Sequence, residues 1–149
     1  MHAYRAKLTP ASAWEPGETG FVVTFPEWEW GVTQGETEAE ALAMAEDALD
    51  AMVASQIGAG AELPRPVTRE LAQDERLVPL APQTAAAAAL YEAMRAAGVS
   101  GSELAGRLAI DQRKVRQMLD PRRSAKLPDL DAALRALGRR LVVEARDAA

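Results

Sequence analysis

The side chains best suited to specific recognition lie within seven consecutive residues of the C-terminal half. Residues 112–118 read QRKVRQM, in which Val115 and Met118 are spaced to share one face of a helix. The remaining side chains then form a polar and cationic face: Gln112, Arg113, Lys114, Arg116 and Gln117. Arg pairs in bidentate fashion with guanine and Gln with adenine, each good pair giving roughly 1–3 kcal/mol of discrimination. The pattern predicts a helix that reads the major groove of double-stranded DNA, although a basic helix face is also common as plain solvated surface.

Two short helices that meet at a tight turn are expected to position this face. Ser100 and Glu103 form an S-x-x-E capping box at the start of the first helix, and Asp111 is placed to cap the second. Leu104 and Leu108 supply the inward stripe of the first helix. A helix-turn-helix is therefore predicted, within a bundle of four helices.

A cationic loop follows the predicted recognition helix. Residues 121–126 read PRRSAK and carry Arg122, Arg123 and Lys126. Cations beside a recognition helix commonly contact phosphates and set its register, while the helix itself contacts bases. We expect these three side chains to bind the DNA backbone, and the alternative is a solvated loop.

The chain ends with an apolar segment after Gly138. Leu141, Val142 and Val143 are too few for a further helix and include β-branched residues, so a strand is expected. An unpaired strand edge favours pairing with a second copy, and a two-fold dimer would place two recognition helices about 34–36 Å apart, one turn of DNA. We therefore expect a homodimer through these residues, or else a strand that returns to the N-terminal sheet.

Charge divides the chain into two parts. Residues 1–80 hold 5 basic and 14 acidic side chains, whereas residues 81–149 hold 12 basic and 8 acidic ones. Phosphate backbones attract the second part and repel the first. Two domains with different partners are predicted, residues 1–80 and residues 84–149, joined by a linker around residues 81–83.

The N-terminal part reads as an α+β unit in which a helix covers a small antiparallel sheet. Alternating apolar residues and turn signals predict strands at residues 4–8, 20–25, near 32 and 76–80. Thr37 and Glu40 form a capping box that begins a helix between the last two strands, and Gly35 before it suggests a turn with positive φ. In the C-terminal part, helices are expected at about 84–97, ended by Gly98, and from 128 or 129 to 137.

Composition argues against several classes of function. The chain has no cysteine and a single histidine, His2, which leaves little for disulfides, thiolate zinc sites or catalytic triads. The carboxylates of the first predicted helix are expected on its solvated face: Glu38, Glu40, Glu46, Asp47 and Asp50. No catalytic residue, metal site or cofactor is predicted. No apolar run approaches the ~18 residues of a membrane span and the start lacks a secretion signal, so we expect a cytoplasmic protein that does not contact membranes.

Three sequence motifs carry a family resemblance. They are Y-x-A-x-L-T-P at residues 4–10, G-F-V-V-T-F-P at 20–26 and T-Q-G-E-T-x-x-E-A at 33–41. With these motifs the chain resembles HicB-type antitoxins over nearly its whole length. The resemblance implies a degenerate ribonuclease H-like N-terminal domain that binds and blocks a HicA-type toxin, a small mRNA-cleaving ribonuclease. It also implies a C-terminal DNA-binding domain that represses the operon, and no enzymatic activity.

The chain departs from the family after Pro26, where it reads EWEWG. Glu27, Trp28, Glu29 and Trp30 are the predicted toxin contacts, because Trp is enriched among binding hot spots and acidic side chains complement a basic, RNA-gripping partner. The two tryptophans would face one side of an extended chain, and the alternative is that they fill the core of the sheet. Two other functions remain open: a stand-alone transcriptional regulator whose N-terminal domain oligomerises or senses a ligand, and a nuclease with a DNA-targeting domain.

Overall fold

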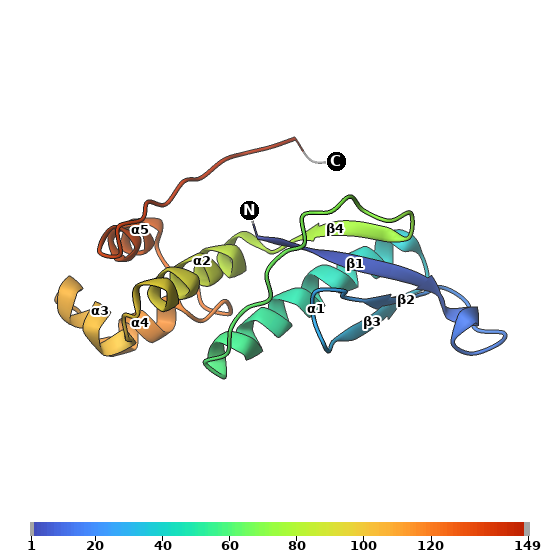
Figure 1. The fold of residues 1–149 in the computed structure, drawn as a ribbon, viewed down its shortest axis with the longest axis horizontal. Helices are drawn as coiled ribbons and strands as arrows, with labels where there is room; N and C mark the ends of the chain where they lie inside the picture. Colours follow the sequence, from blue (N-terminus) through green and yellow to red (C-terminus); the bar gives the residue numbers. More distant parts are fainter. Residues whose placement is uncertain (1, 148–149) are drawn as a thin grey trace.

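The computed structural model describes residues 2–147 as a four-stranded sheet, a long helix against it and a group of shorter helices (Figure 1). A short 3-10 helix, Ala11–Ala13, follows the first strand. The strands and α-helices are, in chain order, β1 Ala3–Pro10, β2 Phe21–Thr24, β3 Val32–Gly35, α1 Glu38–Gly58, β4 Glu75–Pro79, α2 Pro82–Ala97, α3 Gly101–Leu108, α4 Gln112–Met118 and α5 Leu127–Arg135. The predicted α+β class and the order of elements in the N-terminal half are confirmed.

All neighbouring strands of the sheet are antiparallel, in the order β3-β2-β1-β4. β2 pairs with β1 as a hairpin, with Leu8 opposite Val23, and β4 returns to the other side of β1, with Tyr4 opposite Val78. α1 packs against all four strands and covers one face of the sheet. The sheet's apolar side chains on that face therefore lie in a core shared with α1.

α1 begins where the capping box predicts. The Thr37 hydroxyl accepts a hydrogen bond from the Glu40 amide at 3.1 Å, and the Glu40 carboxylate accepts one from the Glu36 amide at 3.1 Å. Gly35 differs from the prediction, because it does not have a positive φ. A Cβ at Gly35 would lie 2.4 Å from the backbone nitrogen of Ala41, so the glycine is needed for the close approach of β3 to α1.

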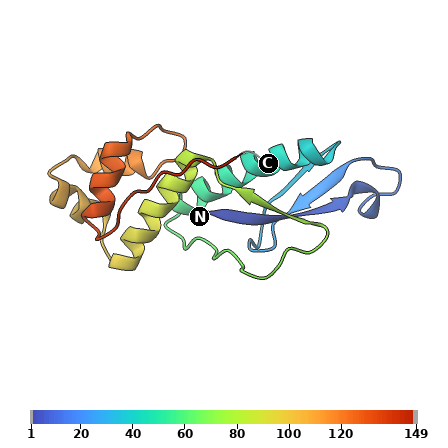
Figure 2. The same ribbon diagram turned by 90° about the horizontal axis from the view of Figure 1, so that it is seen from above.

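α2 contributes to two hydrophobic clusters. Ala88 and Tyr91 belong to the cluster between the sheet and α1, whereas Leu90 and Met94 belong to the cluster formed with α3, α4 and α5. Pro82 and Gln83, expected in a linker, form the first turn of α2. Figure 2 shows α2 between the sheet end and the small helices. Gly98 ends α2 in the left-handed conformation, with φ of 64°, as predicted.

The C-terminal segment corrects a prediction. Residues 141–143 do not form a strand, since the described chain offers them no ladder partner. Leu141 is half-buried, and its amide donates to Asp131 at 3.1 Å. Val142 and Val143 are 78% and 72% exposed, in a segment that leaves α5 in an extended course (Figure 1).

Candidate nucleic-acid and partner interfaces

The start of α4 is fixed by a short turn after α3. Ser100 caps α3 by accepting from the Glu103 amide at 3.1 Å. Ala109, with a left-handed φ of 52°, ends α3, and the Ile110 amide donates to the Ala105 carbonyl at 3.0 Å. The Asp111 carboxylate then accepts from the Arg113 amide at 2.7 Å and caps α4. Both caps were predicted; Ser100 fixes the start of α3 and Asp111 the start of α4.

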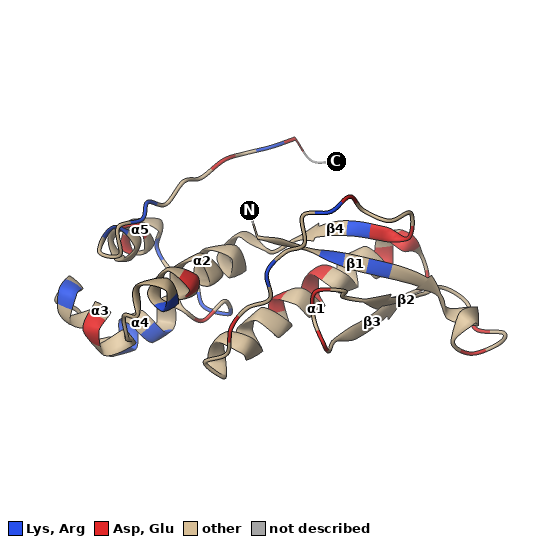
Figure 3. Cartoon of the chain, in the orientation of Figure 1, with Lys and Arg blue, Asp and Glu red and all other residues tan. Residues whose placement is uncertain are grey.

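One face of α4 is buried and the other is open to solvent. Val115 and Met118 lie in the core of the helical cluster. All five residues predicted for DNA contact are exposed, namely Gln112, Arg113, Lys114, Arg116 and Gln117. Within residues 2–147, Arg113, Lys114 and Arg116 form no ion pair, so their charges are available to a partner. Figure 3 shows these cations gathered at the end of the molecule distant from β3.

The cationic loop after α4 is divided between two surface hollows. Arg123 joins α4 in the first, which we call the arginine hollow; it has a volume of about 510 Å³ and is lined by Arg113, Arg116, Gln117, Asp120 and Arg123. Lys126 lines the second, a groove of about 360 Å³, together with Lys114 and Gln117. Arg122 is exposed and lies outside both. The structure thus brings most of the predicted DNA contacts side by side.

Asp120 holds the two arginines of this loop. Its carboxylate accepts from Arg122 Nε at 3.0 Å and Nη2 at 3.3 Å, and Arg123 Nε lies 3.6 Å from Asp120 Oδ2. The hydrogen bond from Arg122 keeps the pKa of Asp120 below its usual range. Asp120 was absent from the predicted site, because a single acidic residue among cations carries no sequence signal.

The EWEW segment is split between the interior and the surface. The Glu27 side chain is almost fully buried and accepts from the Arg5 amide at 3.1 Å. Trp28 is buried edge-to-face against Tyr4, with ring centroids 5.2 Å apart. Glu29 is exposed, and Trp30 is 46% exposed with its ring 6.0 Å from that of Trp28. Only Glu29 and Trp30 therefore face outward, and Glu27 and Trp28 support them from beneath.

The exposed pair borders a hollow of about 430 Å³ at this end of the sheet. It is lined by Glu27, Trp28, Glu29, Trp30, Gln56, Glu62, Leu63, Pro64 and Arg65. Three carboxylates and two indole rings against one guanidinium make the lining acidic and aromatic. Such a surface suits a cationic side chain of a partner, which gains both ion pairing and contact with an aromatic face.

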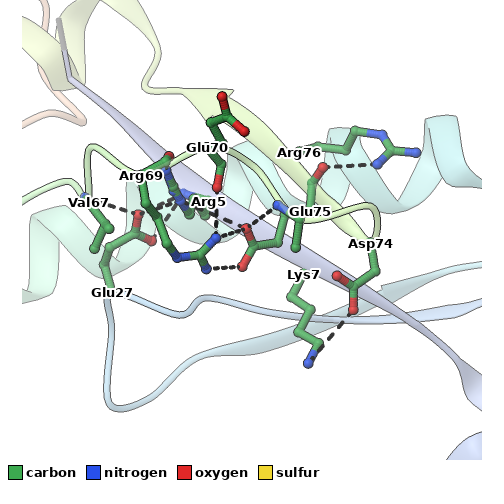
Figure 4. A network of polar contacts seen from close by, with 10 residues as sticks. Arg5, Lys7, Glu27, Val67, Arg69, Glu70, Asp74, Glu75 and Arg76 are labelled. Carbon is green, nitrogen blue, oxygen red and sulfur yellow. Dashed lines mark hydrogen bonds and ion pairs between the residues drawn. The ribbon is translucent and has the colours of Figure 1, made fainter.

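A buried ionic network fastens the segment before β4 to the sheet (Figure 4). Arg5 on β1 is 3% exposed, its Nη2 donates to the Arg69 carbonyl, and its Nε lies 4.0 Å from Glu27 and 3.9 Å from Glu75. Glu75 accepts from Arg69 at 2.6 and 2.9 Å and from the Ala72 amide at 2.9 Å. These bonds lower the pKa of Glu75 to about 2. The network was not predicted, because its members are far apart in sequence.

The carboxylates considered for catalysis are dispersed. Within residues 2–147, no three His, Asp or Glu side chains are grouped so that they could hold a metal ion. None of the helices described there combines the length and apolar character that crossing a membrane requires.

Comparison with known proteins identifies the family of this α+β chain. No family model matches it. Antitoxin HicB 2 of Photorhabdus laumondii subsp. laumondii is 33% identical over 127 residues, which cover 85% of this chain and 88% of that protein. Antitoxin HicB 1 of the same organism is 30% identical over 126 residues, covering 85% and 79%. The chain belongs to the HicB antitoxin family.

A solved structure is also similar in sequence. A chain of a toxin-antitoxin complex from Streptococcus pneumoniae is 32% identical, with a TM-score of 0.41. The match covers 49% of this chain and spans about half, 51%, of that one.

The Glu75 network makes a prediction about acid stability. A carboxylate whose folded pKa is depressed stabilises the fold above its unfolded pKa, near 4.5, and this contribution is lost as the pH falls towards about 2. We expect Glu75→Gln to unfold at lower urea concentration than wild type at pH 7, with the difference narrowing between pH 4.5 and 2. Glu70→Gln, which removes an exposed neighbouring carboxylate, is the control. A difference that stays constant with pH would refute this role of the Glu75 charge.

Proposed function

We propose that this chain is an antitoxin that binds and neutralises a HicA-type mRNA-cleaving toxin and represses its own operon by binding operator DNA. We propose further that it acts in the cytoplasm, by binding and not by catalysis. The observation that carries the DNA half is the open cationic face of α4, whose three unpaired cations are fixed in direction by the Asp111 cap and the burial of Val115 and Met118.

The antitoxin half rests on the HicB family and on charge. A ribonuclease that grips RNA must present a basic surface, which residues 1–80 complement with 14 acidic against 5 basic side chains. Within that part, the hollow beside Glu29 and Trp30 offers carboxylates and an exposed indole together. We assign the toxin contact to Glu29 and Trp30, with Glu27 and Trp28 as the layer that positions them.

In the DNA half, α3 and α4 would act as a helix-turn-helix. Gln112, Arg113, Arg116 and Gln117 would face bases, and Lys114, Arg122, Arg123 and Lys126 would contact the backbone. Residues 84–149 would form this domain and residues 1–80 the toxin-binding domain.

Dimerisation would place two such domains on one operator. The exposed Val142 and Val143, next to the half-buried Leu141, offer an extended edge that a second copy can pair with. The chain would then be a homodimer through these residues. A chain that ends after Gly138 and still dimerises would refute this assignment.

A stand-alone transcriptional regulator is the competing function. It would share the α4 surface but would have no need of the acidic, aromatic hollow. Substitution of Trp30 therefore distinguishes the two functions, because it should weaken toxin binding by an antitoxin and should have no such effect on a stand-alone regulator.

Substitution of the tryptophans should separate binding from folding. Trp30→Ala should weaken binding of the HicA-type toxin by about 2 kcal/mol or more, close to 30-fold, with a small change in Tm. Trp28→Ala should instead destabilise the fold by about 3–5 kcal/mol, because it empties a buried site. Trp14→Ala removes another exposed indole, 62% exposed against 46% for Trp30, and is the control. Calorimetric titration and thermal unfolding measure the two effects, and unchanged toxin affinity in Trp30→Ala would exclude the assigned contact.

The α4 surface makes a separate prediction about DNA. Arg116→Ala should cost about 1–3 kcal/mol of operator affinity while changing binding to random duplex much less, because a base contact is lost. Arg65→Ala makes the same charge change in the segment between α1 and β4, outside both hollows of the α4 surface, and should bind operator as wild type does. Fluorescence anisotropy with both duplexes measures the effect. Equal losses on operator and random DNA would mean that Arg116 contacts the backbone and reads no base.

A further inference from the structure

Asp120 occupies an unusual position for a carboxylate on a DNA-binding surface. It lies just beyond the end of α4 and lines the arginine hollow together with Arg113 and Arg116. Arg122 and Arg123 approach it from the loop. The Asp120 carboxylate is thus paired with Arg122 and Arg123, and it shares the arginine hollow with Arg113 and Arg116, neither of which forms an ion pair within the described residues.

A phosphate group can replace Asp120 as the anion that Arg122 and Arg123 bind. Arg122 is 82% and Arg123 62% exposed in their side chains, and ion pairs between exposed groups contribute little to stability. Guanidinium groups bind phosphate oxygens with the same bidentate geometry that Arg122 uses on Asp120. The arginine hollow is lined by three guanidinium groups against one carboxylate, so its lining has a net positive charge.

We infer that the arginine hollow is a binding site for one backbone phosphate of duplex DNA and that Asp120 is its internal competitor. Unoccupied, the site keeps Arg122 and Arg123 folded back on Asp120. In the complex, a phosphodiester takes over these guanidinium groups together with Arg113 and Arg116. The inference rests on the DNA-binding part of the proposed function and reassigns Arg113 and Arg116 from purely base contacts to shared ones.

Asp120 then lowers the affinity for DNA. Its ionised carboxylate must release the arginines and also repels the incoming phosphate, so it weakens binding to every sequence alike. It limits the backbone contribution to affinity, on which a repressor depends when it searches among non-specific sites. Asp120 is thus a positioning residue that contacts no base.

The test compares Asp120→Asn with Asp74→Asn. Asn at position 120 keeps an oxygen that can accept from the Arg122 amide, now at 3.0 Å, so the turn should persist. Asp74 is an exposed carboxylate in the segment before β4, and its substitution gives the same change in net charge. Fluorescence anisotropy measures the binding of each full-length variant to a random-sequence duplex. The salt concentration is varied from about 0.05 to about 0.3 M, a range wide enough to give the slope of log K against log salt.

We expect Asp120→Asn to bind random and operator duplexes about three- to tenfold more tightly at about 0.1 M salt. The slope of log K against log salt should steepen by up to about one, because the wild-type carboxylate offsets one of the positive charges that neutralise the phosphate. Asp74→Asn should match wild type. If Asp120→Asn has the same affinity and salt dependence as wild type, and wild type binds operator, the inference is overturned and the proposed function stands.

A second readout covers the case in which wild type binds neither duplex, which would refute the DNA half of the proposed function. Inorganic pyrophosphate is titrated into labelled protein, and the Arg Nε signals are followed by NMR. Shifts at Arg113, Arg116 and Arg123 that grow in Asp120→Asn would retain the hollow as a phosphate site. No shift at these residues would overturn the inference.

Discussion

The packing of α2 on both of its sides is the constraint on which the rest of the molecule depends. Tyr91 packs into the sheet core and donates to the Ala61 carbonyl at 2.7 Å, whereas Leu90 and Met94 are buried among the small helices. Neither cluster would be complete without this helix, because each half of the chain alone is small for an independent core. α2 therefore connects the part of the chain that carries the acidic, aromatic hollow to the part that carries the cationic face of α4.

Much of the fold could be predicted, because many of its signals are local. The capping box at Thr37, the N-cap at Ser100 and the helix end at Gly98 each depend on residues within one helical turn, and all three are confirmed. Interactions between distant residues could not be predicted in this way. Arg5 and Glu75 meet only because β4 lies beside β1, and Gly35 is required only because α1 crosses so close to β3.

In the candidate sites too, features set by local sequence were predicted and features set by tertiary contacts were not. The exposed face of α4 follows from helical periodicity, and the structure agrees with it residue by residue. The two tryptophans were expected on one side of an extended chain, but the chain turns at residues 26–27 and bends at 29–30, and Gly31 has a φ of 99°. Their rings still pack edge-to-face, with centroids 6.0 Å apart, yet they differ in exposure. Trp28 therefore enters the core and Trp30 stays at the surface. The contacts of Asp120 depend on how the following loop folds back, which residue types alone do not specify.

The central claim is that this chain silences a ribonuclease, and a cleavage assay with purified proteins tests it most directly. A HicA-type ribonuclease would be purified alone and as a complex with the full-length chain, and mRNA cleavage would be followed for both. The account predicts a stable complex, cleavage by the free partner and suppression of cleavage as this chain is added to stoichiometric amounts. Cleavage that continues at saturating amounts of this chain, or the absence of any complex, would contradict the account.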